Sequence, residues 1–342
     1  MPLSITKWLA LIGLAFFITA CSKDQVQSAP MVVIEGATMG TYYRVKVVTD
    51  KITDQAAFQA EIDKRLELVN DQMSTYRPNS ELSLFNQAEQ SHQVSADTIA
   101  VVQKGIELAQ LTQGALDITV GPLVNLWGFG PDARPTHSPS AEKIAERKAI
   151  TGIEHLSVSG LTLKKAIPEL YVDLSSIAKG FGVDQIAEYI ESLGEQHYLV
   201  DIGGELRMKG SNDKHLPWRI AVEKPVTNER AIQEIVLPVD NAVATSGDYR
   251  NYFEEDGERF SHMINPITGM PIKHKLVSVT VIDKSSMVSD GLATAIMVMG
   301  PKLGYDFAVQ QKLPVFMITK TETGFSEQYT QQFAPYLLQE AK

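Results

Sequence analysis

Cysteine is almost absent from this sequence: the only cysteine among its 342 residues is Cys21. A single thiol cannot form an internal disulfide, and the chain beyond Cys21 offers no cysteine nucleophile. Apolar side chains make up 44% of the residues, which is ordinary for a globular protein with a large core. We therefore expect buried apolar surface, rather than cross-links, to stabilise the folded chain.

Excess positive charge and the common phosphate-binding loops are also missing. The formal net charge is −10, and it becomes −11 without residues 1–20, which carry one lysine and no acid. No basic run is present that could displace the counterions of a nucleic acid, so we expect no nucleic-acid partner. The patterns GxGxxG, GxxxxGK(S/T) and HExxH do not occur, and neither does a Cys/His cluster. Any nucleotide site must therefore be built in another way.

The N-terminus has the features of an export signal. Lys7 precedes the apolar run Trp8–Ile18, whose eleven residues are too few to cross a bilayer as a helix. Ile18–Cys21 resembles the bacterial lipobox, in which the cysteine is lipidated and becomes the mature N-terminus. The alternative is a plain secretory signal in which Cys21 is incidental.

This start suggests a division of the chain into three parts. We expect residues 1–20 to be a lipoprotein signal peptide and residues 21–30 to be a polar, lipid-anchored tether. Residues 31–342 would then form the folded domain.

Apolar periodicity divides that domain into short strands and several helices. Apolar residues alternate on both sides of Gly36–Gly40, which predicts a strand pair, and Gln55–Met73 has helical spacing. Strands outnumber helices and short turns often join them, which favours an α+β fold with mixed, largely antiparallel sheets and packed helices over a doubly wound parallel fold. Further helices are predicted at 98–111, 141–149 and 180–193, a hairpin at 161–176, two strands around Gly203–Gly204, and strands at 218–222, 231–237, 241–246 and 277–282.

The segment Val288–Gly300 is predicted to be a packed apolar helix that ends at Gly300 and Pro301. Asp290 and Thr294 are four residues apart, so they should project from one face of this helix. Carboxylate and hydroxyl oxygens are ligands that suit Mg²⁺. The alternative is that Asp290 is a first-turn acid that favours the helix dipole, after an N-cap at Ser289.

Three glycine-containing or turn-rich stretches carry side chains suited to a planar ring. Met39 and Tyr76 could cover or stack on such a ring, and Asp117 could accept a hydrogen bond from a ring N–H or an amine. Each has a structural alternative, because a tyrosine often lies in a core and Asp117 could cap the next turn.

Two further segments carry polar groups. Asp173–Gly182 brings an acid, two hydroxyls and Lys179 into a turn before a helix, where free backbone N–H groups can bind phosphate oxygens. The alternative is a capping turn with Lys179 in solvent. His262 lies among turn-forming residues and could be structural or catalytic, and Arg250 could contact a phosphate.

Taken together and in order, these stretches resemble the ApbE family of bacterial flavin transferases, which take FMN from FAD and attach it to a protein threonine. The resemblance extends from about Gly36 to Gly300. Its order is far more specific than any one motif, and the lipoprotein-like start also fits many members. The stretches are MGTYY, MSTYRPNSELS, GALDITVGPLVNLWGFG, DLSSIAKGFGVD, VDIGGELRMKG, TSGDYRNYF, SHMINPITG and VSDGLATAIMVMG.

The resemblance implies a Mg²⁺-dependent transfer of FMN from FAD to a threonine hydroxyl through a phosphoester bond, with release of AMP. It implies that Ser176, Asp290 and Thr294 hold the Mg²⁺ ion. Either His262 or Asp290 could take the proton from the hydroxyl, and the sequence does not decide between them. The residues implied to surround FAD are Met39, Tyr76, Ala115, Leu116, Asp117, Lys179 and Ile264.

The acceptors implied by the resemblance are flavoprotein subunits of membrane redox complexes, such as the Na⁺-translocating NADH:quinone reductase and the Rnf complex. A lipid anchor at Cys21 would hold the enzyme on the periplasmic side of the cell inner membrane. The outer membrane is the alternative, because Ser22 is not the aspartate that usually retains lipoproteins in the inner membrane. Two other functions stay open: a Mg²⁺-dependent FAD pyrophosphatase, and a non-catalytic, exported flavin-binding lipoprotein.

Overall fold

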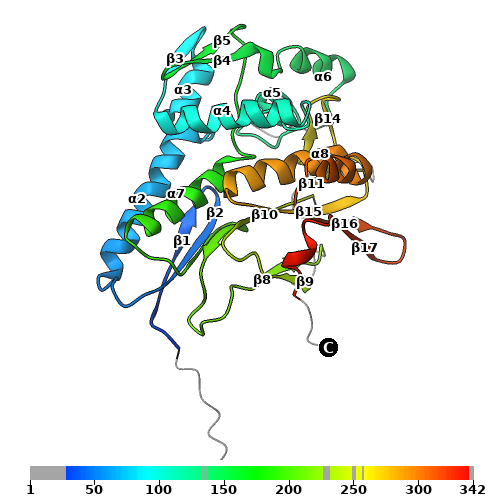
Figure 1. The fold of residues 1–342 in the computed structure, drawn as a ribbon. Coiled ribbons are helices and arrows are strands. Elements are labelled where there is room, and N and C mark those ends of the chain that lie inside the picture. The colour runs from blue at the N-terminus through cyan, green and yellow to red at the C-terminus, as the bar shows by residue number, and fades with distance from the viewer. Residues whose placement is uncertain are drawn as a thin grey trace, which may run out of the picture.

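The computed structural model describes residues 28–338, except 133, 134, 136, 226–231, 249–251, 256 and 257. Its largest element is an eight-stranded sheet in which every neighbouring pair of strands is antiparallel, with the order β1-β2-β6-β7-β10-β15-β16-β17 (Figure 1). This sheet confirms the predicted α+β class. Its strands are β1 (Met31–Thr38), β2 (Thr41–Val48), β6 (Tyr198–Ile202), β7 (Glu205–Lys209), β10 (Ala242–Gly247), β15 (Leu276–Asp283), β16 (Val315–Lys320) and β17 (Phe325–Tyr329).

A two-glycine turn joins β6 to β7, as the sequence predicts. Gly203 has φ +62° and Gly204 has φ +105°, and glycine reaches this region without steric strain. A Cβ atom on Gly203 would lie 2.7 Å from Thr41 Cγ2 on β2. The turn therefore excludes a side chain, and it places Glu205 at the first position of β7.

Three helices cover one face of the sheet (Figure 1). Helix α2 (Gln55–Met73) packs on β1, α7 (Ala178–Ser192) on β6 and β7, and α8 (Ser286–Gln310) on β10 and β15. Helix α2 has the predicted bounds, and the Asp54 side chain accepts a hydrogen bond from the Ala57 N–H group at 2.9 Å as its N-cap. Burial of each large aliphatic side chain beneath these helices contributes about 1.5–3 kcal/mol.

The opposite face of the sheet is covered by the hairpin of β8 (Ile220–Glu223) and β9 (Ile232–Val236) and by the 3-10 helix η2 (Ala334–Tyr336). Phe333 packs there against Phe316 of β16, with 5.5 Å between the ring centroids, and Trp218 belongs to the same buried cluster. Cover on both faces explains why β15 is buried along nearly its whole length.

A second group of small elements lies beyond α7 and α8 in Figure 1. It includes the two remaining predicted helices, α4 (Ala96–Leu111), which begins two residues before its predicted start, and α6 (Ala141–Lys148), which buries none of its residues. The other elements of this group are α3 (Glu81–Gln87), α5 (Gly121–Leu126), η1 (Ile153–His155), the sheet of β3 (Ser91–Gln93), β5 (Thr162–Lys165) and β4 (Leu156–Ser159), and the hairpin of β13 (Ile264–Asn265) with β14 (Met270–Pro271). A further hairpin pairs β11 (Tyr252–Glu255) with β12 (Glu258–Ser261), and its Phe260 ring stacks on Trp127 at the end of α5.

The hairpin predicted within residues 161–176 is wrong in its second half. Strand β5 pairs with β3 and β4, and residues 166–177 form no strand. The Val172 N–H group donates to Asn86 Oδ1 at 2.8 Å, and the Asp173 N–H group donates to the Ile118 carbonyl at 2.7 Å. A side-chain amide and a loop carbonyl thus satisfy this backbone, so it needs no strand partner.

Helix α8 begins earlier than predicted and continues past Gly300. Its N-cap is Ser285, whose Oγ accepts a hydrogen bond from the Val288 N–H group at 3.3 Å. The alternative in which Ser289 is the N-cap and Asp290 a first-turn acid is therefore wrong. Gly300 does break the helical conformation, with φ +81°, but a further helical segment follows, because Pro301 is tolerated in the first turn of a helix.

Within the described part of the chain, no helix has both the length and the apolar character needed to cross a membrane. The predicted signal peptide, Cys21 and most of the tether lie outside the described residues, and so does Arg250.

Candidate active site

The first turns of α7 and α8 are each capped by a carboxylate from the other helix. Asp290 of α8 accepts a hydrogen bond at Oδ2 from the Gly180 N–H group of α7, at 3.1 Å. Asp184 of α7 accepts from the Ser286 and Met287 N–H groups of α8, at 3.0 and 3.1 Å. Each carboxylate thus satisfies amide groups that the other helix leaves free, and it lies at that helix's positive end. We call this arrangement the reciprocal cap.

Gly180 allows the two helices to approach closely enough for the reciprocal cap. A Cβ atom on Gly180 would lie 2.3 Å from the Ser286 carbonyl oxygen and 2.6 Å from Met287 Cα. Both neighbours are backbone atoms, so neither could move without displacing α8. Any side chain at position 180 would push the helices apart and lengthen the Asp290 hydrogen bond.

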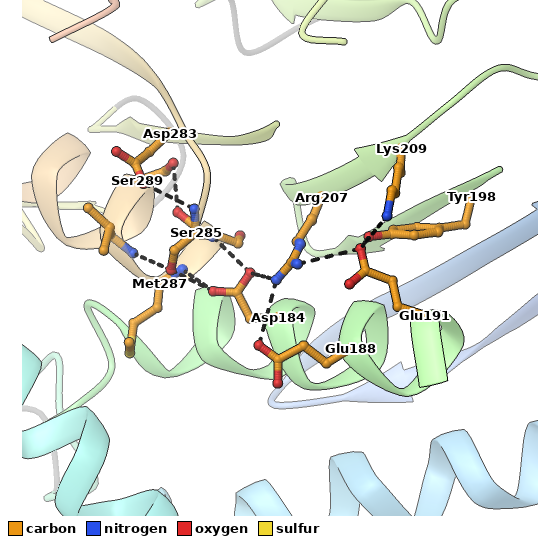
Figure 2. Close-up of polar contacts among 12 residues, drawn as sticks. Asp184, Glu188, Glu191, Tyr198, Arg207, Lys209, Asp283, Ser285, Met287 and Ser289 are labelled. Carbon is orange, nitrogen blue, oxygen red and sulfur yellow. Dashed lines mark hydrogen bonds and ion pairs between the residues drawn. The ribbon is translucent and has the colours of Figure 1, made fainter. Parts of the chain in front are cut away.

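The Asp184 carboxylate belongs to a longer polar network (Figure 2). It also accepts hydrogen bonds from Ser285 Oγ at 2.7 Å and from Arg207 Nη1 of β7 at 3.0 Å. Arg207 Nη2 lies 3.7 Å from Glu191 Oε1, which accepts a hydrogen bond from the Tyr198 hydroxyl at 2.6 Å. The network therefore fixes the start of α8 against α7 and the centre of the sheet.

A cavity of about 460 Å³ opens beside the reciprocal cap. This volume lies within the usual range for a small-molecule site. Its walls come from the turn before α7, from α8, β7 and β10, and from the segments around α5 and β13. The lining residues are Tyr76, Val120, Val124, Phe129, Asp173, Ser175, Ser176, Lys179, Gly203, Glu205, Thr245, Ser246, Gly247, His262, Met263, Ile264, Asp290, Thr294 and Val298.

Three charged side chains meet at this cavity. Lys179 Nζ lies 3.1 Å from Glu205 Oε1 and 3.4 Å from Asp290 Oδ2. The two carboxylate side chains are 5% and 4% exposed, whereas the Lys179 side chain is 30% exposed. One ammonium group therefore bridges two buried carboxylates, and the alternative in which Lys179 projects into solvent is wrong.

Burial and charge act against each other in this cluster. Burial raises the pKa of Glu205 to about 8, although the Lys179 ammonium partly opposes the shift. Burial likewise raises the pKa of Asp290, and Lys179 and the Gly180 N–H group oppose it. Burial alone would lower the pKa of Lys179, but attraction to Asp290 and Glu205 outweighs it and raises this pKa. The cluster thus attracts positive charge.

Seven of the residues that the sequence singles out line the same cavity, although they come from distant parts of the chain. Tyr76 is 66% exposed at this cavity, which rules out its alternative place in the core. His262 is half-buried, and its ring meets the edge of Phe129 at 6.3 Å between ring centroids. The seven are Tyr76, Ser176, Lys179, His262, Ile264, Asp290 and Thr294.

Four other predicted residues lie outside the cavity wall. Met39 is in the β1–β2 turn and lines a separate hollow against α2. Ala115 and Leu116 are buried in the hydrophobic core, where Leu116 lies close to Gly291 of α8. Asp117 Oδ1 accepts hydrogen bonds from both the N–H and the hydroxyl of Thr119, at 2.7 and 2.6 Å, which agrees with its alternative role as a turn cap.

The sequence did not point to Glu205 or Asp184. A carboxylate directly after a glycine pair, at the start of a strand, was the available signal for Glu205. Asp184 gave no signal, because it follows helical spacing and its partners on α8 lie about a hundred residues away.

A sequence model of the ApbE family matches residues 39–317. The chain belongs to the ApbE family. Among ApbE relatives, the FAD:protein FMN transferase of Vibrio cholerae is 54% identical over 334 residues, which cover 97% of this chain and 99% of the relative. The protein of the same name from Haemophilus influenzae is 46% identical over 325 residues, 92% of each chain.

Solved ApbE structures have the same fold. The flavin transferase ApbE from Vibrio cholerae superposes with a TM-score of 0.84 at 55% identity, covering 90% of this chain and 100% of that one. The apo flavinyl transferase ApbE from Pseudomonas stutzeri also gives a TM-score of 0.84, at 39% identity, covering 92% of this chain and 99% of that one. These ApbE structures support the α+β architecture over nearly the whole described chain.

Proposed function

We propose that this chain is an FAD:protein FMN transferase that attaches FMN to a threonine hydroxyl of another protein. Relatives that bear this enzyme name match almost its full length. The observation that carries the proposal is the convergence of Lys179, Asp290 and the start of α7 on one cavity. A helix N-terminus and an ammonium group are the features that bind phosphate oxygens.

In the proposed reaction, the threonine oxygen forms a bond to the phosphorus atom of the FMN half of FAD. The bond between this phosphorus and the bridging oxygen breaks, and AMP leaves with the electron pair. The hydroxyl proton passes to a base. Negative charge develops on the phosphate oxygens, and Lys179 is placed to stabilise it.

We assign the base to His262 rather than to Asp290. The Asp290 carboxylate already accepts a hydrogen bond from the Gly180 N–H group and lies against Lys179. His262 lines the cavity, and contact with Phe129 orients its ring. An imidazole side chain is suited to accept a proton near neutral pH.

The donor set around Asp290 suits a bound Mg²⁺ ion. Among the residues that the structure describes, no group of three or more His, Cys, Asp or Glu side chains is placed to hold a metal. Mg²⁺ usually takes one or two carboxylates together with substrate phosphates, so it does not need such a group. Asp290 would hold it with the hydroxyls of Thr294 and Ser176, which line the same cavity. The ion would neutralise charge on the pyrophosphate.

We also propose where the enzyme works. Residues 1–20 would direct export, and lipid at Cys21 would anchor the domain of residues 31–342 through the tether to the periplasmic side of the inner membrane. This position suits acceptors that are flavoprotein subunits of membrane redox complexes of the Na⁺-translocating NADH:quinone reductase and Rnf types. Loss of membrane association in a Cys21→Ser variant would support the anchor, and unchanged association would contradict it.

The test of the transfer is incubation of the full chain, in detergent, with FAD, Mg²⁺ and a threonine-containing acceptor peptide. We expect the peptide to gain the mass of one FMN group while AMP appears, and a peptide with valine in place of threonine to gain nothing. Free FMN with an unmodified peptide would indicate a pyrophosphatase, and unchanged FAD a binding protein.

Single substitutions test whether this cavity is the active site. Asp290→Asn should abolish transfer, whereas Asp306→Asn should not, because Asp306 lies on the same helix but is 58% exposed and pairs with Lys302. His262→Ala should slow transfer while FAD binding is retained. Wild-type rates in both site variants would exclude this cavity as the active site.

A further inference from the structure

Glu205 has a buried carboxylate oxygen without a hydrogen-bond partner. Its Oε1 lies 3.1 Å from Lys179 Nζ, but its Oε2 is buried and accepts no hydrogen bond. The side chain is 5% exposed and belongs to the cavity wall. An unsatisfied buried polar atom is unfavourable, and more so when the group is charged. The protein thus holds an oxygen donor at the site that none of the described side chains uses.

The position of Lys179 shows where positive charge is favoured. Its ammonium lies within 3.5 Å of both Asp290 oxygens and 3.1 Å from Glu205, so the two carboxylates attract one shared cation. Two carboxylate groups share this one ammonium group, so Glu205 Oε2 is left as an oxygen donor for a second cation. Lysine is also a flexible counter-ion on a long stem, and its side chain here is 30% exposed.

We propose that Glu205 is a further ligand of the divalent cation held by Asp290, and that the Lys179 ammonium competes with this cation for both carboxylates. The inference deepens the proposed function, because it rests on a cation at Asp290. It adds Glu205, which the sequence did not single out. It also gives Lys179 a second role besides phosphate binding.

Competition of this kind couples the dinucleotide to the cation. A bound pyrophosphate would draw the Lys179 ammonium away from Glu205 and Asp290. Both carboxylates would then be free to bind the cation. Without the dinucleotide, Lys179 remains on the carboxylates and keeps the cation affinity low. Because coupling free energies are reciprocal, each ligand should strengthen the binding of the other by the same factor.

The test is direct binding of Mn²⁺ to the full chain, followed by electron paramagnetic resonance, with no flavin and no acceptor present. Glu205→Gln keeps the shape of the side chain but removes its charge, and we expect the Kd for Mn²⁺ to rise at least about tenfold. Lys179→Met removes the competitor, and the Kd should fall by a similar factor. If the Lys179–Glu205 ion pair were only structural, both variants would bind Mn²⁺ more weakly than the wild type.

Matched controls come from another lysine–glutamate pair. Lys104 and Glu107 of α4 form an ion pair at 2.5 Å, and the Lys104 side chain is 29% exposed, close to the value for Lys179. Neither residue lines the cavity. Lys104→Met and Glu107→Gln should leave the Kd for Mn²⁺ unchanged.

A second measurement, with FAD added, tests the coupling. FAD should tighten Mn²⁺ binding in the wild type, and by a smaller factor in Lys179→Met. An unchanged Kd in Glu205→Gln, or a higher Kd in Lys179→Met, would overturn the proposal. If circular dichroism shows that Glu205→Gln does not fold, the Kd for Mn²⁺ of Lys179→Met alone tests the proposal: a lower Kd supports it and a higher Kd overturns it. Loss of peptide flavinylation with these Mn²⁺ results intact would instead count against the transferase function alone.

Discussion

Replacing Asp184 by alanine should destabilise the protein more than the loss of any exposed acid. The change removes one acceptor from four donors, namely Ser285 Oγ, the Ser286 and Met287 N–H groups, and Arg207 Nη1. The Asp184 side chain is 8% exposed, and that of Arg207 is 19% exposed.

The size of the effect follows from two losses. Removal of one partner of a buried ion pair costs about 3–5 kcal/mol, because the other charge stays buried. Arg207 keeps Glu191 within 3.7 Å, which favours the lower end of that range. Loss of the acceptor for the first amide groups of α8 adds about 1 kcal/mol. We therefore expect Asp184→Ala to lower the free energy of unfolding by about 3–5 kcal/mol.

Urea unfolding with linear extrapolation measures this loss. Glu188→Ala is the matched control, since Glu188 is on the same helix and lies 3.8 Å from Arg207 but is 60% exposed. An exposed pair of this kind should contribute no more than about 1 kcal/mol. If Asp184→Ala were no less stable than Glu188→Ala, the reciprocal cap would not stabilise the start of α8, and our reasoning would be refuted.

Three other predictions concern single residues. Burial lowers the pKa of His274, whose Nε2–H donates to the Met297 carbonyl and whose Nδ1 is buried without a partner. The free energy of unfolding should therefore fall as the pH drops below about 6.5, and urea unfolding at pH 7 and pH 5 should show that His274→Gln removes this part of the loss. Gly203→Ala should lower the free energy of unfolding by about 1–3 kcal/mol, because the new methyl group would meet Thr41 at a positive φ; a variant as stable as the wild type in urea would contradict this. Thr294→Val should raise the Mg²⁺ concentration for half-maximal FMN transfer by about tenfold or more, and an unchanged Mg²⁺ titration would remove Thr294 from the cation site.

The local sequence pattern predicted those helices and strands whose own residues determine their structure. Helix α2 has the predicted bounds because Phe58, Ile62 and Leu66 recur on one face and Asp54 caps its first turn. The two strands around Gly203 and Gly204 were equally clear, since the turn needs glycine whatever surrounds it.

Predictions failed where distant segments decide the structure. Helix α8 has its N-cap at Ser285 rather than at Ser289, and Asp184, about a hundred residues earlier, accepts hydrogen bonds from the Ser285 hydroxyl and from the Ser286 and Met287 N–H groups. The strand expected near Val172 is a loop because Asn86, far along the chain, satisfies its backbone. Neither set of contacts can be inferred from the residues that neighbour these segments in the sequence.

The candidate site divides in the same way. Asp290 and Thr294 were paired by helical spacing alone, and the structure places both on one cavity. Glu205 and Asp184 were not predicted because their partners, Lys179 and the start of α8, lie on other elements. The flavin-binding roles of Met39, Ala115, Leu116 and Asp117 remain predictions, as these residues lie beyond the cavity wall.

The reciprocal cap also bears on how the site is assembled. A carboxylate from the other helix accepts hydrogen bonds from free amide groups in the first turn of α7 and of α8, so a half-formed pair leaves these amides unsatisfied. Folding of the two helix starts is therefore interdependent, and fraying of one exposes the amides of both. Lys179 lies in the first turn of α7 and Asp290 one turn into α8, so the proposed anion-binding and cation-binding halves of the site form together.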